Sequence, residues 1–195
     1  GMNATVNAAE LPDSELLEKI AGGDREAFKI LYGRYVRQVF SFIFKLTGDS
    51  KLTEEVTNDV FFDVWKGAGR FQGRSAVSTW IFGIAHNKTM NELRKKTPDP
   101  VDPEEFVRVA NPDAGAEEIV EKKDRSERMK KALNELSPDH RTVLELTFFE
   151  GMSYQEIAAV MDCPVNTVKT RMFYAKEKLK EAFTKYGISQ EDFAL

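Results

Sequence analysis

The hydrophobic pattern of residues 153–181 predicts two helices separated by a tight turn. In the first of these helices, apolar residues recur at the i, i+3, i+4 and i+7 spacing of a single helical face. Ser153 is placed to cap this helix, and Glu156 three residues later completes a capping box. Pro164 ends the helix because the residue before a proline is displaced from the α region. The second helix begins near this proline, and its apolar stripe continues to about Phe183.

The outward face of the second helix combines hydrogen-bonding, aromatic and cationic side chains. Opposite the apolar stripe, or flanking it, lie Asn166, Lys169, Thr170, Arg171, Phe173, Tyr174, Lys176 and Lys178. Amides and hydroxyls can bind base edges in a major groove, an aromatic ring can contact a thymine methyl, and cations can bind phosphates. An amphipathic hairpin in a helical bundle, with a solvated basic face, is the alternative interpretation. The capped short helix, the proline turn and the outward face together favour a DNA-binding helix-turn-helix.

Helical spacing of apolar residues extends over most of the remaining chain. Upstream, the predicted helices run from Ser14 to the Gly22-Gly23 pair and then over residues 24–48, 49–65 and 79–96. The second of these is rich in aromatic residues and is the expected centre of a helical core. Downstream, helices are predicted around residues 126–136 and over 138–149. The pattern contains no clear strand and no internal repeat, so it predicts an all-α fold.

Residues 97–121 differ from the rest of the chain. They contain four prolines, many acidic residues and few large apolar ones. Such a segment cannot bury enough surface to fold, so it predicts an extended acidic linker. The expected architecture is two small helical domains joined by an acidic, proline-containing linker. The predicted ranges are 11–96 for the first domain, 97–121 for the linker and 122–187 for the helix-turn-helix domain.

The composition is that of an ordinary globular protein, with 195 residues, a formal net charge of −4 and one cysteine. The lone Cys163 excludes an intramolecular disulfide and a cysteine cluster for a metal, which is consistent with a reducing cytosol. No apolar run is long enough to span a bilayer, and no segment has the pattern of a signal peptide. A cytoplasmic protein without membrane insertion is therefore expected.

The charges are distributed unevenly along the chain. Residues 70–96 contain six cations against Glu92, a net charge of +5, and residues 163–185 carry a net charge of +4. Residues 49–63, in contrast, carry a net charge of −4. Two basic patches and a separate acidic one favour a protein that touches DNA in two places and a protein partner in a third.

The acidic patch has a helical repeat of its own. Glu55, Asp59 and Asp63 recur at i, i+4 and i+8, on a different side from the apolar residues of the same helix. Like charges at this spacing destabilise an isolated helix by a few tenths of a kcal/mol each. The two interpretations are a solvated acidic face and a docking surface for a basic partner.

Two stretches of the chain resemble bacterial sigma factors. The segment LNELSPDHRTVLELTFFEGMSYQEIAAVMDCPVNTVKTRMFYAKEKLKE is similar to their C-terminal promoter-reading domain. Upstream, TNDVFFDVW followed by FQGRSAVSTWIFGIAHNKTMNELRKK resembles their other universal domain. A chain with only these two domains resembles the extracytoplasmic-function (ECF) subfamily, and the match extends from about Leu16 to Phe183. The resemblance implies a transcription initiation factor that binds core RNA polymerase, directs it to specific promoters and helps to melt the DNA.

The resemblance assigns the first domain to core polymerase and to the minus-ten promoter element. The residues expected to bind the clamp helices of the polymerase are Glu54, Glu55, Asp59 and Asp63. The residues expected to hold the minus-ten element are Phe71, Gln72, Arg74 and Ser75 in a loop and Trp80, His86, Asn87, Lys88, Asn91, Arg94 and Lys95 on the next helix. Aromatic residues along a basic track suit a single strand, and a loop pocket suits a flipped base. For Trp80 and Phe82 the alternative role is packing in the core.

The resemblance assigns the second domain to the minus-thirty-five element as duplex. The residues expected to read it are Asn166, Thr167, Lys169, Thr170, Arg171, Phe173, Tyr174 and Lys176, with the two lysines on phosphates. This chain has Tyr174-Ala175-Lys176 where the family frequently has arginine-alanine-arginine. Arginine is the usual bidentate reader of guanine, so the base preference of this helix is expected to differ. In the acidic helix, Asn58-Asp59 stands where glutamine-glutamate is common.

The resemblance also implies partners for the chain. An anti-sigma factor clamped between the two domains would hold the free protein inactive, and the free protein is expected to be a monomer. No cofactor is implied. Core RNA polymerase and promoter DNA are the partners expected after release.

Three other classes of function compete with this interpretation. An enzyme is disfavoured because His86 and His140 lie in different domains and no phosphate loop or metal-spaced cluster is present. A dimeric helix-turn-helix repressor or activator would have no need of the acidic helix and the basic first domain. A protein-interaction module or anti-factor leaves the polar face of the recognition helix unexplained. Binding to promoter DNA discriminates a sigma factor from a repressor or activator. A sigma factor should bind its promoter weakly without polymerase, whereas a repressor should not need polymerase to bind.

Overall fold

The computed structural model describes residues 6–95 and 115–193. In this part of the chain all regular structure is helical, which confirms the all-α prediction. In chain order, the elements are η1 (Ala8–Glu10), α1 (Asp13–Ala21), α2 (Arg25–Thr47), α3 (Ser50–Gly67), η2 (Ala68–Arg70), α4 (Val77–Lys95), α6 (Ala116–Asn134), α7 (Pro138–Phe148), α8 (Tyr154–Met161), α9 (Val165–Tyr186) and η3 (Gln190–Phe193).

Helix α2 is the central element of the first domain, as its aromatic-rich pattern predicts. It begins where the Asp24 carboxylate accepts hydrogen bonds from the backbone N–H groups of the first turn. It ends at Gly48, whose φ of 65° is the left-handed conformation that glycine adopts without strain. Helix α1 lies against α2, where Arg34 Nη1 is 2.8 Å from Asp13 Oδ1. The Tyr35 hydroxyl also donates to the Asp13 carboxylate, so one side chain of α1 holds two of α2.

Helices α3 and α4 complete the first domain. The Asp49 carboxylate caps α3 by accepting from the Leu52 backbone N–H at 3.0 Å. Buried valines on α3 pack toward α2 and α4, and the fully buried Phe82 of α4 meets Phe42 of α2 edge to face at 5.4 Å. Phe82 is therefore a core residue. Helix α4 begins at Val77, two residues before the predicted start.

The second domain contains the predicted helix-turn-helix. Ser153 and Glu156 form the predicted capping box at the start of α8. Asp162 ends this helix at a φ of 51°, and α9 then begins at Val165 with Pro164 as its N-cap. Helix α7 packs against α9, and Phe183 near the end of α9 is fully buried. The turn thus combines a left-handed residue with a proline, so the chain reverses direction within a few residues.

Helix α6 begins at Ala116, ten residues before the expected start, and takes up the last residues of the predicted linker. The other residues predicted to form the linker, 97–114, lie outside the described part of the chain. The far end of α6 is tied to α9, because Glu135 Oε1 accepts from Lys185 Nζ at 2.9 Å and from the Tyr186 hydroxyl at 2.8 Å. These contacts join the two ends of the second domain.

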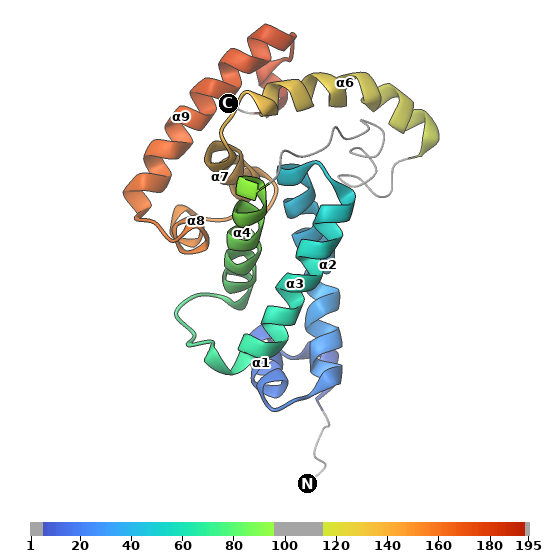
Figure 1. Ribbon diagram of the computed structural model, residues 1–195, viewed down its shortest axis with the longest axis vertical. Coiled ribbons are helices and arrows are strands. Elements are labelled where there is room, and N and C mark those ends of the chain that lie inside the picture. Colours follow the sequence, from blue (N-terminus) through green and yellow to red (C-terminus); the bar gives the residue numbers. More distant parts are fainter. Residues whose placement is uncertain (1–5, 96–114, 194–195) are drawn as a thin grey trace.

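The two domains lie in direct contact (Figure 1). Helix α4 stands between the rest of the first domain and α8, while the end of α2 meets α7. Buried apolar residues of both domains form one continuous cluster. The sequence pattern predicted both domains but contained nothing about this contact, which brings the proposed minus-ten helix against the helix-turn-helix.

Candidate nucleic-acid interface

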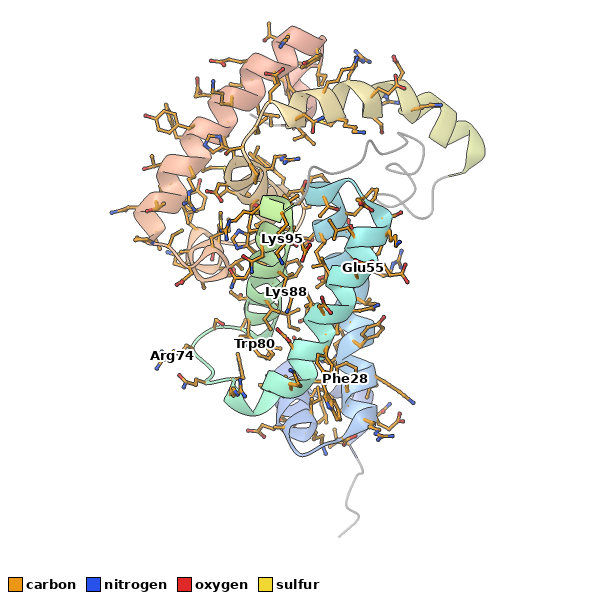
Figure 2. All side chains as sticks on the ribbon, viewed as in Figure 1. Phe28, Glu55, Arg74, Trp80, Lys88 and Lys95 are labelled. Carbon is orange, nitrogen blue, oxygen red and sulfur yellow. The ribbon has the colours of Figure 1, made fainter. Side chains whose placement is uncertain are left out.

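The acidic face of α3 is exposed over most of its length. Glu54, Glu55 and Asp59 are all exposed, and Glu55 is labelled on α3 in Figure 2. Asp63 differs, because its Oδ2 lies 3.0 Å from Lys88 Nζ on α4. The structure therefore divides the four predicted acidic residues into three that face solvent and one that neutralises a cation of the adjacent helix.

An exposed aromatic residue adjoins this acidic face. The Phe62 side chain is 58% exposed, and Lys66 Nζ lies 4.5 Å from the centre of its ring. The sequence analysis did not single out Phe62. Its signal was its position, because Phe62 falls outside the inward stripe formed by Val60, Phe61 and Val64. An exposed phenylalanine among carboxylates adds an apolar anchor to a charged surface.

The loop before α4 presents its polar residues outward. Gln72 and Arg74 are exposed on either side of Gly73, which has a φ of 70°. Figure 2 shows Arg74 on this loop, away from the helices. Phe71 is instead half-buried, with its ring 5.4 Å from that of Trp80. The loop thus has an anchored beginning and an outward polar tip.

Trp80 is half-buried and forms one wall of a small cavity. Its indole packs on Gly67, where an added Cβ would lie 3.3 Å from the ring. The cavity has a volume of about 320 Å³. Its other walls come from Asp63, Lys66, Arg70 and Ile84. Trp80 therefore packs against the end of α3 and also lies beside the cations Lys66 and Arg70.

The polar face of α4 contains most of the other predicted minus-ten residues. Asn87 and Asn91 are exposed, and Arg94 Nη1 donates to Asn91 Oδ1 at 3.0 Å. Lys95 at the end of the helix is exposed, with Nζ 3.6 Å from Glu92 Oε1. In Figure 2, Trp80, Lys88 and Lys95 follow one another along α4. These residues form a track of polar and cationic side chains along α4.

His86 is set apart from this track. It is 7% exposed, and neither ring nitrogen has a hydrogen-bond partner. Burial lowers the pKa of this imidazole, while Asp139 of the second domain opposes the shift. His86 therefore lies at the contact between the domains, where its ring is almost completely buried.

The recognition helix α9 presents the predicted aromatic residues to solvent. Phe173 is 61% exposed and Tyr174 is 55% exposed, with their rings edge to face at 5.4 Å. Asn166, Lys169 and Thr170 are also exposed. The Thr170 hydroxyl donates to the Asn166 carbonyl at 3.0 Å. Two large rings exposed side by side on a helix are unusual for a monomeric surface and indicate a binding face.

Other predicted residues of α9 are partly covered. Thr167 and Lys176 are half-buried at the edges of the face. Arg171 Nη2 lies 3.7 Å from Asp139 Oδ2, and its Nη1 lies 3.7 Å from Cys163 Sγ. The guanidinium is thus held on the side of α9 that faces the first domain.

Arg171 lines a cleft between the domains. The cleft has a volume of about 790 Å³. Its first-domain wall is made by α4, including His86, Asn87, Asn91 and Arg94. Its second-domain wall includes Asp139, Asp162 and Arg171. Residues predicted to touch two separate promoter elements thus share one cleft.

The described residues contain no group of three or more potential ligands that could hold a metal ion. Among those same residues, no helix has the length and apolar character needed to cross a membrane.

Two family models match the chain. The model described as Sigma-70 region 2 matches residues 31–98, and the model described as Sigma-70, region 4 matches residues 126–179. The first match covers α3, the loop and α4, and the second covers the helix-turn-helix. Both matches fall on the surfaces described above.

Full-length relatives match over most of the chain. The RNA polymerase sigma-H factor of Pseudomonas aeruginosa is 32% identical, with 87% of this chain and 93% of the relative covered. The ECF RNA polymerase sigma-E factor of Escherichia coli K12 is 30% identical with the same coverage.

Solved structures share the fold. CnrH, in complex with the cytosolic domain of CnrY, matches with a TM-score of 0.65 at 23% identity and covers 92% of this chain and 99% of that one. The Bartonella quintana sigma factor RpoE, in complex with the anti-sigma factor NepR, matches with a TM-score of 0.62 at 23% identity, covering 80% and 96%. The two domain matches and the identity to full-length relatives show that the chain belongs to the ECF sigma factors of RNA polymerase.

Proposed function

We propose that this chain directs core RNA polymerase to its promoters through three separate surfaces of the described structure. As a sigma factor it acts in transcription initiation. The main support for assigning these surfaces is that all three occur in one chain. The acidic face of α3 is exposed, the α4 helix carries an aromatic and cationic track, and the α9 helix exposes two aromatic rings.

The acidic face of α3 is the proposed polymerase-binding surface. Glu54, Glu55 and Asp59 provide exposed carboxylates for a basic partner, the clamp helices. Phe62, which lies between the acidic positions 59 and 63, adds an apolar contact that can be desolvated. Asp63 has a secondary role, because its carboxylate already binds Lys88.

The loop and α4 form the proposed minus-ten surface. Arg74 and Gln72 at the loop tip and the polar face of α4 would hold one DNA strand by its backbone and base edges. The cavity beside Trp80 is large enough for a planar base, and Lys66 and Arg70 flank it. A base captured there would be lost from the duplex stack, which favours melting without covalent chemistry. We propose no catalytic step for this chain.

The α9 helix forms the proposed minus-thirty-five surface. Asn166 at its start can form paired hydrogen bonds with adenine in a major groove. Phe173 and Tyr174 can contact thymine methyl groups, and the lysines at 169 and 176 can contact phosphates. In this surface Tyr174, which stands where the family more frequently has arginine, would contact a thymine methyl group.

The proposal includes a regulatory partner and a place of action. Two structures that share the fold are complexes, RpoE with an anti-sigma factor and CnrH with the cytosolic domain of CnrY. An anti-sigma factor for this chain, a monomeric free state and action in the cytoplasm beside RNA polymerase are parts of the proposal. The division into domains at 11–96 and 122–187 is also retained as part of it.

A pull-down with core RNA polymerase tests the proposed docking face. The test variant is Glu55→Lys/Asp59→Lys, and its matched control is Glu15→Lys/Glu18→Lys, which makes the same change of charge at exposed positions of α1. We expect the wild type and the α1 control to bind and the α3 variant to lose binding. Binding that survives the α3 reversal would contradict the surface. No binding by the wild type, with tight binding to duplex DNA alone, would instead favour a dimeric regulator.

A further inference from the structure

Helix α9 contains a single arginine, and this residue does not lie on the outward face of the helix. Arg171 is the only arginine between Val165 and Tyr186. Its side chain is partly buried, whereas Phe173 and Tyr174 are more than half exposed. At 100° per residue, Arg171 lies beside the buried stripe of α9 and not opposite it. Arg171 therefore belongs to the flank of the recognition helix.

Two groups of the same domain hold the Arg171 guanidinium on this flank. Its Nη2 lies 3.7 Å from Asp139 Oδ2, and its Nη1 donates to Cys163 Sγ at 3.7 Å. Asp139 lies in the first turn of α7, and Cys163 lies in the turn between α8 and α9. Helices α7 and α9 pack against each other. All three residues thus belong to one packed unit, so these contacts do not depend on where the first domain lies.

The start of α7 fixes the position of the Asp139 carboxylate. Ser137 Oγ caps this helix by accepting from the His140 backbone N–H at 3.2 Å, and Pro138 is its first residue. A carboxylate in the first turn of a helix is stabilised by the helix dipole. Arginine pairs strongly with such an anion, in the same way that it pairs with a phosphate. Asp139 thus presents a negative charge at a defined place beside the flank of α9.

The outward face of α9 has the chemistry of adenine-thymine recognition. Asn166 is exposed, and among the described residues no hydrogen bond engages its side-chain amide. Such an amide can pair with N6 and N7 of adenine in a major groove. The exposed rings of Phe173 and Tyr174 offer apolar contact to thymine methyl groups. These three side chains can therefore recognise adenine-thymine pairs without an arginine.

The lysines near this face do not replace an arginine as a reader of guanine. Lys169 and Lys176 are seven residues apart, about two helical turns, so they lie one above the other on the flank opposite Arg171. Cations at the edge of a recognition helix contact the phosphates that border the groove. Lysine also lacks the planar fork that pairs with O6 and N7 of guanine. While Arg171 stays on its flank, the outward face has no guanidinium for guanine.

We infer that Asp139 sets the base preference of α9 by withholding Arg171 from base edges, so that the preferred duplex is rich in adenine-thymine pairs. This inference rests on the proposed minus-thirty-five function of α9 and names the class of duplex that this surface takes. Asp139 is a positioning residue, because it contacts Arg171 and not DNA. To read guanine, Arg171 would have to leave Asp139 and Cys163 and reach around to the outward face.

Base discrimination by the polymerase complex tests this inference with the full chain. Duplexes bound by polymerase with the wild-type chain are selected from a randomised pool, and the site of α9 is located by its loss in Phe173→Ala/Tyr174→Ala. Single adenine-thymine pairs in that site are then replaced by guanine-cytosine pairs. We expect wild type to prefer adenine-thymine and Asp139→Asn to reduce this preference about two- to fivefold at one position, since the ion pair is partly exposed. Fluorescence anisotropy at fixed salt measures both affinities, and their ratio cancels a general change in attraction to phosphates.

Two further variants separate positioning from a merely structural role. Asp162→Asn makes the same change of charge at another exposed residue of the domain, one that forms no ion pair with Arg171 in the described structure, and should match the wild type. Asp139→Asn/Arg171→Gln should also recover the wild-type preference, because the released arginine causes the change. Circular dichroism and thermal melting would establish that each variant is folded.

Equal base preference for folded Asp139→Asn and Asp162→Asn would overturn the inference. A wild type that selects guanine at a position where Arg171→Gln abolishes the preference would also overturn it, and this measurement does not require Asp139→Asn to fold. Either result, obtained with a wild type that binds polymerase and selects a duplex through α9, leaves the proposed function intact. A wild type that binds no polymerase, or whose complex selects no duplex, would remove the proposed function and the inference together.

Discussion

Helices α4 and α9 carry similar polar and cationic residues but present them to different surroundings. On α9, Phe173 and Tyr174 project into solvent with more than half of each side chain exposed. On α4, one side is covered by α8, and Lys88 is paired with Asp63. The recognition helix is thus ready to bind, whereas the proposed minus-ten helix is partly neutralised and partly covered.

The largest expected effect is on stability, and it distinguishes the buried face of α9 from its exposed face. Phe183→Ala should reduce the free energy of unfolding of the second domain by about 3–5 kcal/mol, because this fully buried ring fills the core. Phe173→Ala, at an exposed ring of the same helix, should leave unfolding nearly unchanged. Thermal and urea unfolding followed by circular dichroism would measure both. Equal destabilisation by the two variants would show that Phe173 belongs to the core.

The next effect concerns DNA recognition by the exposed rings. Phe173→Ala/Tyr174→Ala should weaken binding of the polymerase complex to duplex DNA selected by the wild type, by about 1–3 kcal/mol for each base pair whose recognition is lost. Fluorescence anisotropy at fixed salt would measure the affinity. Tyr32→Ala, which truncates an exposed ring on α2, is the control and should not change it. An unchanged affinity for the double variant would exclude these rings from base recognition.

The contact between the two domains should depend on pH through Glu145, whose Oε2 lies 4.0 Å from Lys45 Nζ of the first domain. The form with the domains in contact is called closed here, and the form with the domains apart is called open. Burial, with a smaller contribution from Glu150, raises the pKa of Glu145 from 4.5 to about 8, while Lys45 and Arg141 oppose the shift. The closed form therefore binds a proton that the open form releases. Stabilisation of the closed form is complete below about pH 4.5 and is lost as pH rises through about 8.

Small-angle scattering between pH 7 and 9 would measure this effect. The radius of gyration should increase with pH in the wild type, and Glu145→Gln, which cannot titrate, should remain compact. Burial also raises the pKa of Glu150, which acts in the same direction. Burial lowers the pKa of Lys45, which acts in the opposite direction. Burial lowers the pKa of His86, so its protonation would open the protein only toward acidic pH. A compact wild type at pH 9 would contradict the prediction.

The smallest effect concerns the pair between α3 and α4. Asp63→Asn frees Lys88, and because the pair is partly exposed its loss should cost about 0–1 kcal/mol of stability. The released cation should strengthen single-strand binding by the free protein about twofold, as one added phosphate contact predicts at moderate salt. Glu92→Gln, which frees Lys95 instead, is the matched control on the same helix. Weaker binding by Asp63→Asn would show that the pair positions Lys88 for DNA.

Local signals were sufficient for most of the helices. Asp24, Ser137 and Ser153 each cap the helix that follows them, and apolar spacing identified the buried faces. These signals act within four residues, so the sequence contains them directly. Helix α6 begins at Ala116 and so takes up residues 116–121 of the segment predicted to be a linker. Few large apolar residues are present there, but alanine, glutamate and lysine are strong helix formers, so their propensity favours a helix without a large apolar face.

By itself, the sequence determined an all-α chain with two domains, a capped helix-turn-helix and the residues of three candidate surfaces. Only the tertiary structure decided which of these residues are accessible. It buried His86, paired Lys88 with Asp63, exposed Phe62 and placed Lys45 against Glu145. The last contact joins positions 100 residues apart in the chain. No local pattern encodes such a contact, because its free energy depends on which surfaces exclude water together once both domains have folded.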